Sequence, residues 1–284
     1  MPQNTNLNVS PYYDDFDPSK NYKRVLFKPG VPVQARELTT LQSILQDQIE
    51  KFGEHFFKEG SMIIPGSIAY DSNYYAVKIE PTFFGVDVEN YTDELIGLTI
   101  QGKTSGITAV VKQVLARNRS TENATTLYIK YQKSSTENFS TDEFLDGENL
   151  VTLSDFTYGS TTISAGSDFA TCFQSNATAT GSAFGIDSGV YFARGEFIEV
   201  SSETIVLDQY DNTPSYRVGF FVNEQIITAV DDPTLYDNAQ GFSNYTAPGA
   251  DRLKISLSLI KKSLDDFQDE NFIELFRVRN GEVK

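Results

Sequence analysis

Tryptophan is absent from this 284-residue sequence, and cysteine and histidine occur once each. A single cysteine, Cys172, cannot form an intrachain disulfide, which fits a chain that folds in a reducing cytoplasm. The one histidine, His55, would have to carry any Ser-His-Asp or Cys-His site alone, and zinc sites usually take several Cys and His ligands. We therefore predict no catalytic residue, no metal site and no cofactor. We interpret His55 as a packed or surface side chain and Cys172 as a small buried thiol.

Positive charge is also scarce, since 23 Lys and Arg stand against 39 Asp and Glu, which gives a net charge of −16. An acidic surface repels the phosphates of nucleic acid and of anionic membranes. The first residues show no basic stretch followed by an apolar one, so no signal peptide is visible. No apolar run approaches the roughly 18 residues of a membrane span. We predict a protein that binds neither nucleic acid nor membrane.

Motifs that position reactive groups are missing as well. Neither G-x-x-x-x-G-K-[ST] nor G-x-G-x-x-G occurs. The many acidic residues allow a chance pair at the roughly 5–10 Å separation of a glycosidase, but the sequence does not indicate which pair would share a cleft. We therefore predict a protein without enzymatic activity.

The stretch YYDDFDPSKNYKR, residues 12–24, places three aspartates among aromatic side chains. Because carboxylates bind calcium, we compare this stretch with a calcium-binding loop. An EF-hand starting at Asp15 would have Lys20 where a glycine is needed and Leu26 where a bidentate glutamate is needed, so it is rejected. An irregular calcium site stays open on Asp14, Asp15 or Asp17. The segment DPSK predicts a turn instead.

The first 33 residues have little periodicity and are interpreted as an extended N-terminal arm. Aromatic side chains supply contact area at low entropic cost, as they do in protein interfaces. We predict that four of them anchor the arm on a partner: Tyr12, Tyr13, Phe16 and Tyr22.

Residues 34–60 contain the one convincing long helix, with apolar side chains at helical spacing and polar side chains opposite. We call the following six residues the apolar stripe: Leu38, Leu41, Leu45, Ile49, Phe52 and Phe56. The more common arrangement for such a stripe is an amphipathic helix laid across its own sheet. The more specific alternative is a short coiled coil, in which the stripe packs against the same helix of other copies of the chain.

From residue 61 onward, runs rich in Val, Ile, Tyr, Phe and Thr alternate with turn residues. The predicted fold class is α+β, predominantly β, with one long N-terminal amphipathic helix followed by β-sandwich or barrel modules. We predict an inserted small β module over residues 86–155, within a main β domain formed by residues 61–85 and 156–284. The stretch 231–255 is interpreted as a long connecting loop without periodicity.

Four stretches carry a family resemblance: SPYYDDFDPSKNYKRVLFKPGVPVQARELTTLQSILQDQIEKFGEHFFKEGSMIIPG, GVYFARGEFIEV, PSYRVGFFVNE and YDNAQGFSNYTAPGADRLKI. Together they resemble a family of large virion structural proteins of contractile-tailed phages, notably those of marine cyanobacteria, which carry a domain of unknown function. The resemblance covers nearly the whole chain and is weakest over residues 86–155. It brings no catalytic residues with it.

The resemblance implies a baseplate or tail-fibre-associated structural protein, made in the host cytoplasm and located in the virion. Its expected partners are other phage tail or baseplate proteins. We also predict a homo-oligomer, with a trimer favoured, because the heptad-like helix could lie on a threefold axis. Two alternatives remain, a host-surface glycan-binding adhesin module and a tail-associated polysaccharide depolymerase.

Overall fold

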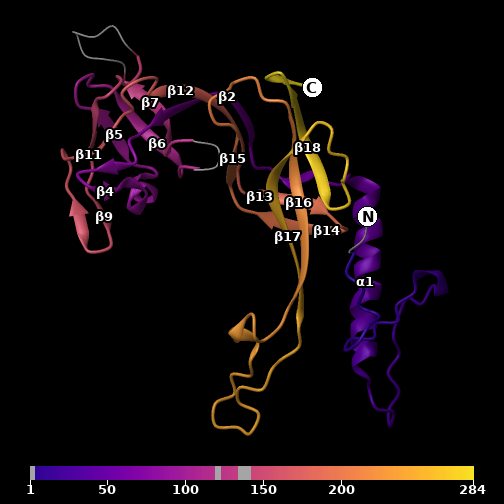
Figure 1. Ribbon diagram of the computed structural model, residues 1–284. Coiled ribbons are helices and arrows are strands. Elements are labelled where there is room, and N and C mark those ends of the chain that lie inside the picture. The colour runs from indigo at the N-terminus through magenta and orange to yellow at the C-terminus, as the bar shows by residue number, and fades with distance from the viewer. Residues whose placement is uncertain (1–3, 119–122, 134–141) are drawn as a thin grey trace. The chain divides into compact units, whose positions relative to one another are not determined.

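The computed structural model describes residues 4–118, 123–133 and 142–284 (Figure 1). Strands hold 43% of the chain and helices 13%, which confirms a predominantly β fold class. Within the described ranges there is one α-helix, and no sheet closes into a barrel. The chain divides into two compact units, each built from segments that are separated in sequence.

Unit 1 comprises Met1–Ile68, Gly185–Ile205 and Tyr216–Arg277. Its longer elements are α1 (Ala35–Phe56), β1 (Met62–Ile64), β13 (Gly189–Ala193), β14 (Glu196–Val200), β16 (Tyr216–Ile227), β17 (Arg252–Ser263) and most of β18 (Phe272–Arg279). One sheet has the strand order β1-β13-β14, and a second begins β17-β16-β18. Strands β16 and β17 pair antiparallel along their whole length, and the 228–251 loop joins their ends (Figure 1).

Aromatic side chains fill the core of unit 1. The rings of Tyr191 and Phe220 meet edge to face at 4.7 Å between centroids. Phe192, the next residue of β13, is fully buried on the other face of the strand, where its ring lies 5.8 Å from that of Phe57. Helix α1 approaches this second face through Gly53, where a Cβ would lie 2.4 Å from Cε2 of Phe192. Only glycine permits that approach, so the residue that interrupts the helical pattern in sequence is a contact point in the fold.

A buried arginine joins β16 to the connection before β18. The Nε of Arg217 donates to Glu274 at 2.6 Å, and its Nη1 donates to Asp269 at 3.1 Å. The hydrogen bond from Arg217 lowers the pKa of Asp269. The pKa of Glu274 is lowered first by Arg277 and then by Arg217.

These lowered pKa values predict a loss of stability in acid that depends on Arg217. Carboxylates whose pKa is lower in the folded state stabilise it above their unfolded pKa of about 4, and this contribution is lost as the pH falls through the folded pKa. In urea unfolding, we expect Arg217→Met to be less stable than wild type at pH 7, and the difference to shrink towards pH 3. A difference that stays constant over this range would contradict the assignment.

Unit 2 comprises Ala69–Phe184, Val206–Ser215 and Val278–Lys284. The strands of its eight-stranded sheet, in spatial order, are β11 (Asp168–Thr171), β8 (Asn149–Thr152), β5 (Thr99–Gly102), β6 (Thr108–Leu115), β7 (Thr126–Lys133), β2 (Ile68–Lys78), β12 (Thr178–Ile186) and β15 (Glu203–Asp208). Shorter elements are β3 (Thr82–Phe83), β4 (Val86–Asp87), β9 (Phe156–Tyr158), β10 (Thr161–Ile163) and β19 (Glu282–Val283). The chain passes between the two units within β2, β12, β15 and β18, and immediately before β16.

The core of unit 2 is built mainly from apolar side chains. Its fully buried side chains include Ile100, Ile107, Leu127 and Phe169. Cys172 is buried among them, and burial raises the pKa of its thiol strongly, so the prediction of a small buried thiol is confirmed.

A buried carboxylate organises one turn of unit 2. The oxygens of Glu148 accept hydrogen bonds from the backbone nitrogens of Leu145 at 2.7 Å, Ser105 at 3.0 Å and Thr104 at 3.1 Å. The Ser105 hydroxyl donates a further bond at 3.0 Å. With the side chain almost fully buried, these four donors replace the water that the carboxylate has lost.

Candidate interaction surface

Helix α1 begins where the sequence provides a start signal. The residues before it include Pro32, and the backbone nitrogen of Gln34 donates to the Glu37 carboxylate at 3.0 Å. This is the reciprocal bond of a capping box, which satisfies a backbone donor that the helix itself cannot pair. The helix therefore covers Ala35–Phe56, which confirms the prediction of a long helix within residues 34–60.

The polar side of α1 faces its own unit. The hydroxyl of Thr40 donates to Asp14 at 3.0 Å, and Ser43 donates to the same carboxylate. The amide of Gln46 donates to the carbonyl of Gly195 at 3.4 Å. Ile44 is the one large apolar side chain of α1 that is buried.

The apolar stripe points the other way. Five of its side chains are exposed, with accessible fractions of 51% for Leu38, 59% for Leu45, 45% for Ile49, 64% for Phe52 and 63% for Phe56, while Leu41 is half-buried. The interpretation that the stripe is laid across the chain's own sheet is therefore wrong. On an α-helix, each residue advances about 100°, which places the six stripe residues within about 80° of one another, opposite Ser43, Asp47 and Glu50.

The N-terminal arm is held to unit 1 by polar groups. The backbone nitrogens of Asn4 and Thr5 donate to the Glu224 carboxylate at 2.9 and 2.8 Å. The Tyr12 hydroxyl donates to Asp251 at 2.6 Å, and this bond is the main cause of its raised pKa. The buried carboxylate of Asp14 then fastens the arm to α1. Figure 1 shows the arm running beside the helix.

The predicted aromatic anchors therefore divide into two pairs. Tyr12 and Phe16 are half-buried against their own unit, whereas Tyr13 and Tyr22 are 57% and 68% exposed. Asp14, which sequence reasoning considered only as a metal ligand, is the main anchor. The prediction of a turn at DPSK is confirmed, because Asp17 caps the short helix Pro18–Lys20 by accepting from the nitrogen of Ser19 at 2.9 Å.

Removing the Asp14 carboxylate is expected to release the arm. In Asp14→Ala, the Thr40 and Ser43 hydroxyls lose their shared acceptor, and we expect a destabilisation of about 1–3 kcal/mol. Limited proteolysis should cut between residues 15 and 33 faster than in wild type, with little change in the cleavage of unit 2. Asp265→Ala, which removes an exposed carboxylate elsewhere in the same unit, is the control. Equal cleavage rates in the two variants would contradict the role of Asp14.

A groove of about 630 Å³ separates the arm from the polar side of α1. Two carboxyls in it have raised pKa values. For Glu50 the causes are burial and then the nearby charge of Glu54, and for Glu196 the cause is burial, partly offset by a hydrogen bond from Gln46. The two shifts therefore have separate causes, since neither carboxyl contributes to the shift of the other.

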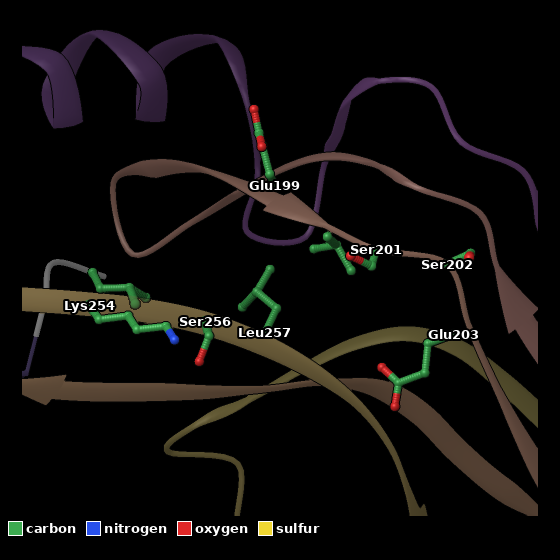
Figure 2. A pocket seen from close by; sticks show the side chains of 9 residues that line it. Glu199, Ser201, Ser202, Glu203, Lys254, Ser256 and Leu257 are labelled. Carbon is green, nitrogen blue, oxygen red and sulfur yellow. The ribbon is translucent and has the colours of Figure 1, made fainter. Parts of the chain in front are cut away.

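A second hollow, of about 430 Å³, lies between the loop after β14 and strand β17. Figure 2 shows Glu199 pointing away from Lys254 and Glu203. The charged side chains that line this hollow therefore do not converge on one point. Glu203 has a structural role, since it accepts a hydrogen bond from the backbone nitrogen of Leu259 at 3.0 Å. Strand β17 is an edge strand, and this bond covers part of its open edge.

The described residues hold no cluster of three His, Cys, Asp or Glu side chains that could bind a metal ion. Among the same residues, none of the helices combines the length and apolarity that crossing a membrane requires. His55 lies exposed on α1, edge to face with Phe56 at 5.0 Å between ring centroids.

The fold and this surface define a predominantly β protein of two units with an outward-facing apolar helix. A family described as a domain of unknown function (DUF4815) matches residues 10–122 and 140–284. The chain belongs to this family. No curated protein and no solved structure matches it.

Proposed function

We propose that this chain is a non-enzymatic structural protein of a bacteriophage tail, most closely associated with the baseplate or tail fibre, and that it acts by assembling with other proteins. The observation that carries the proposal is the exposure of the apolar stripe on α1. The resemblance of the sequence to virion structural proteins of contractile-tailed phages supports the location.

The energetic argument concerns which side of the helix is packed. Burying a Leu, Ile or Phe side chain contributes about 1.5–3 kcal/mol, and contiguous exposed apolar surface typically marks an interaction site. Here the exposed side chains Leu38, Leu45, Ile49, Phe52 and Phe56 contribute little to the stability of their own unit. The same residues would contribute fully in an assembly, where a neighbour removes them from water.

The arm supports the same proposal. Beyond the anchor at Asp14, it presents exposed apolar side chains that include Tyr22 and Leu26, at 68% and 74% accessibility. From Lys20 to Arg36 the sequence has five cations and no carboxylate, within a chain of net charge −16. Such a segment complements an acidic, partly apolar surface on a partner.

We also propose that unit 2 is built as a β-sandwich. The β9–β10 hairpin is separate from the eight-stranded sheet, and both contribute to one core. The ring of Phe156 on β9 packs against Tyr91 at 6.1 Å and against Phe169, on strand β11 of the large sheet, at 6.3 Å. A core shared between two sheets in this way is typical of a sandwich.

Crosslinking mass spectrometry on intact particles of the encoding phage tests the function. We expect the chain in purified virions, with crosslinks from Lys20, Lys23, Lys28 and Lys51 to tail or baseplate proteins. Absence from virions would overturn the proposal. Binding of the purified chain to host polysaccharide would instead favour the adhesin, and release of reducing sugars from it would favour the depolymerase.

A further inference from the structure

We propose that the partner of the apolar stripe is the same helix of other copies of this chain, in a parallel coiled coil with its residues in register. This inference rests on the proposed function, because it names the first partner in the assembly. The coiled-coil seam, formed by the apolar stripes of the copies, would join identical chains. Other virion proteins would then bind elsewhere on the chain.

The exposed face of α1 follows a seven-residue repeat along the whole helix. The two core positions of the repeat, which alternate at spacings of three and four residues, hold Ala35, Leu38, Gln42, Leu45, Ile49, Phe52 and Phe56. This register covers three heptads and includes five of the six stripe residues. The sixth stripe residue, Leu41, is half-buried at the edge of this face.

The charge pattern favours another copy as the occupant. Two copies of a chain of net charge −16 repel each other unless their contact avoids carboxylates. The positions that flank the core hold Thr39, Leu41, Gln46, Gln48, Gly53 and His55, none of which is acidic. All four acidic residues of the helix, Glu37, Asp47, Glu50 and Glu54, lie at the remaining, outer positions.

The packing of α1 leaves room for copies around a shared axis. Its hydrogen bonds to its own unit through Thr40 and Ser43 lie on the side opposite the core positions. Gln46 and Gly53, on one flank of the core, contact Gly195 and Phe192 of the same unit. The body of each copy therefore borders one flank of the seam and leaves all seven core positions exposed. Leu41 widens the apolar face beyond the two core positions, and a wider face suits three helices better than two.

Gln42 specifies the parallel arrangement. In a parallel coiled coil each core position meets the same position of its neighbours, and a single polar residue there fixes the register. An amide carries both a donor and an acceptor, so identical Gln42 side chains can hydrogen-bond to one another. Its side chain is exposed in the single chain and needs no partner there.

Light scattering on the purified chain tests self-association. We expect a mass of three times the 31.7 kDa chain for wild type, and the mass of one chain for Leu45→Glu, whose dissociation constant should rise by about a hundredfold or more because each copy would place a charge in the apolar core. Val230→Glu makes the same exchange at an 82% exposed side chain away from α1 and should remain oligomeric. Circular dichroism should show all three chains folded.

Cysteine crosslinking tests the register. The native Cys172 is buried, so any disulfide between copies would come from the introduced cysteine. Under mild oxidation, Gln42→Cys should form covalent dimers between copies, and Glu54→Cys, on the outer side of the helix, should not. Crosslinking of both or of neither would overturn the parallel seam.

A wild-type chain that stays monomeric at 100 µM would overturn the inference, and so would a Leu45→Glu variant as oligomeric as wild type. These outcomes are separate from failure of the proposed function. A monomeric chain found in virions contradicts only the seam, whereas an oligomeric chain absent from virions contradicts only the function.

Discussion

Replacement of Arg194 by methionine is expected to lower the free energy of unfolding of unit 1 by about 3–5 kcal/mol, the cost of removing one partner from a buried ion pair. The side chains of Arg194 and Glu224 are only 4% and 9% exposed, and the Arg194 Nε lies 3.9 Å from a Glu224 oxygen. Methionine keeps much of the volume but provides no charge and no donor. The buried Glu224 carboxylate would lose the charge of Arg194 that faces it.

Arg194 also joins the arm to the strands. Its Nη1 donates to the Asn4 side chain at 3.0 Å, and its Nη2 donates to the Glu270 carbonyl and the Asn271 side chain, both at 2.7 Å. Burial acts to raise the pKa of Glu224, but hydrogen bonds from Asn4 and Thr5 outweigh it and the pKa is lowered. We therefore expect the arm to loosen in Arg194→Met, in addition to the loss of global stability.

Urea unfolding measures the first effect, and hydrogen exchange of residues 4–14 measures the second. Arg24→Met is the matched control, since it removes the same charge from an exposed position of the same unit and should change stability by less than about 0.5 kcal/mol. If Arg194→Met were no less stable than this control, the network would have no stabilising role.

The second large effect is expected in unit 2, where Glu148→Ala should lower the free energy of unfolding by about 3–5 kcal/mol. The substitution leaves the backbone nitrogens of Thr104, Ser105 and Leu145 without their acceptor. Ser105 is buried and loses the acceptor of its hydroxyl as well as that of its nitrogen, and each buried unpaired donor costs about 1–3 kcal/mol. Glu148→Gln keeps the shape and one acceptor oxygen, so its loss should be about half as large.

If the two units unfold in separate transitions, Glu148→Ala should lower the stability of the unit 2 transition alone. The loss of stability that Arg194→Met causes in unit 1 should then be the same with or without Glu148→Ala. Glu94→Ala removes an exposed carboxylate from unit 2 and serves as the control. Equal stability of Glu148→Ala and Glu94→Ala would show that water replaces the carboxylate at this turn.

The sequence predicted the elements of this fold better than their contacts. The helix at Ala35–Phe56 and the β-rich character of the chain after it were expected from periodicity and turn residues. Periodicity locates an apolar face but says nothing about what covers it, because a core and a protein interface require the same side chains. The orientation of the stripe was therefore open in the sequence and was decided by contacts such as that of Gly53 with Phe192.

The arm shows a second limit of sequence reasoning. Its aromatic residues stand out in composition, yet Asp14 and Asn4 make the contacts that hold it. Those contacts join residues up to 220 positions apart, and no local pattern encodes such a separation. One signal was present, because a carboxylate beside a Ser- and Thr-bearing helix can accept from those hydroxyls.

The alternation of the two units along the chain has a consequence for biosynthesis. Unit 1 requires residues up to Arg277 and unit 2 requires Val278–Lys284, so neither can close until translation has passed nearly the whole sequence. At about 5–20 residues per second, the ribosome needs on the order of 10–45 s to travel from Phe57 to Val278. During that interval α1 has already emerged, and on a polysome the helices of neighbouring nascent chains can meet through their stripes before either chain has folded.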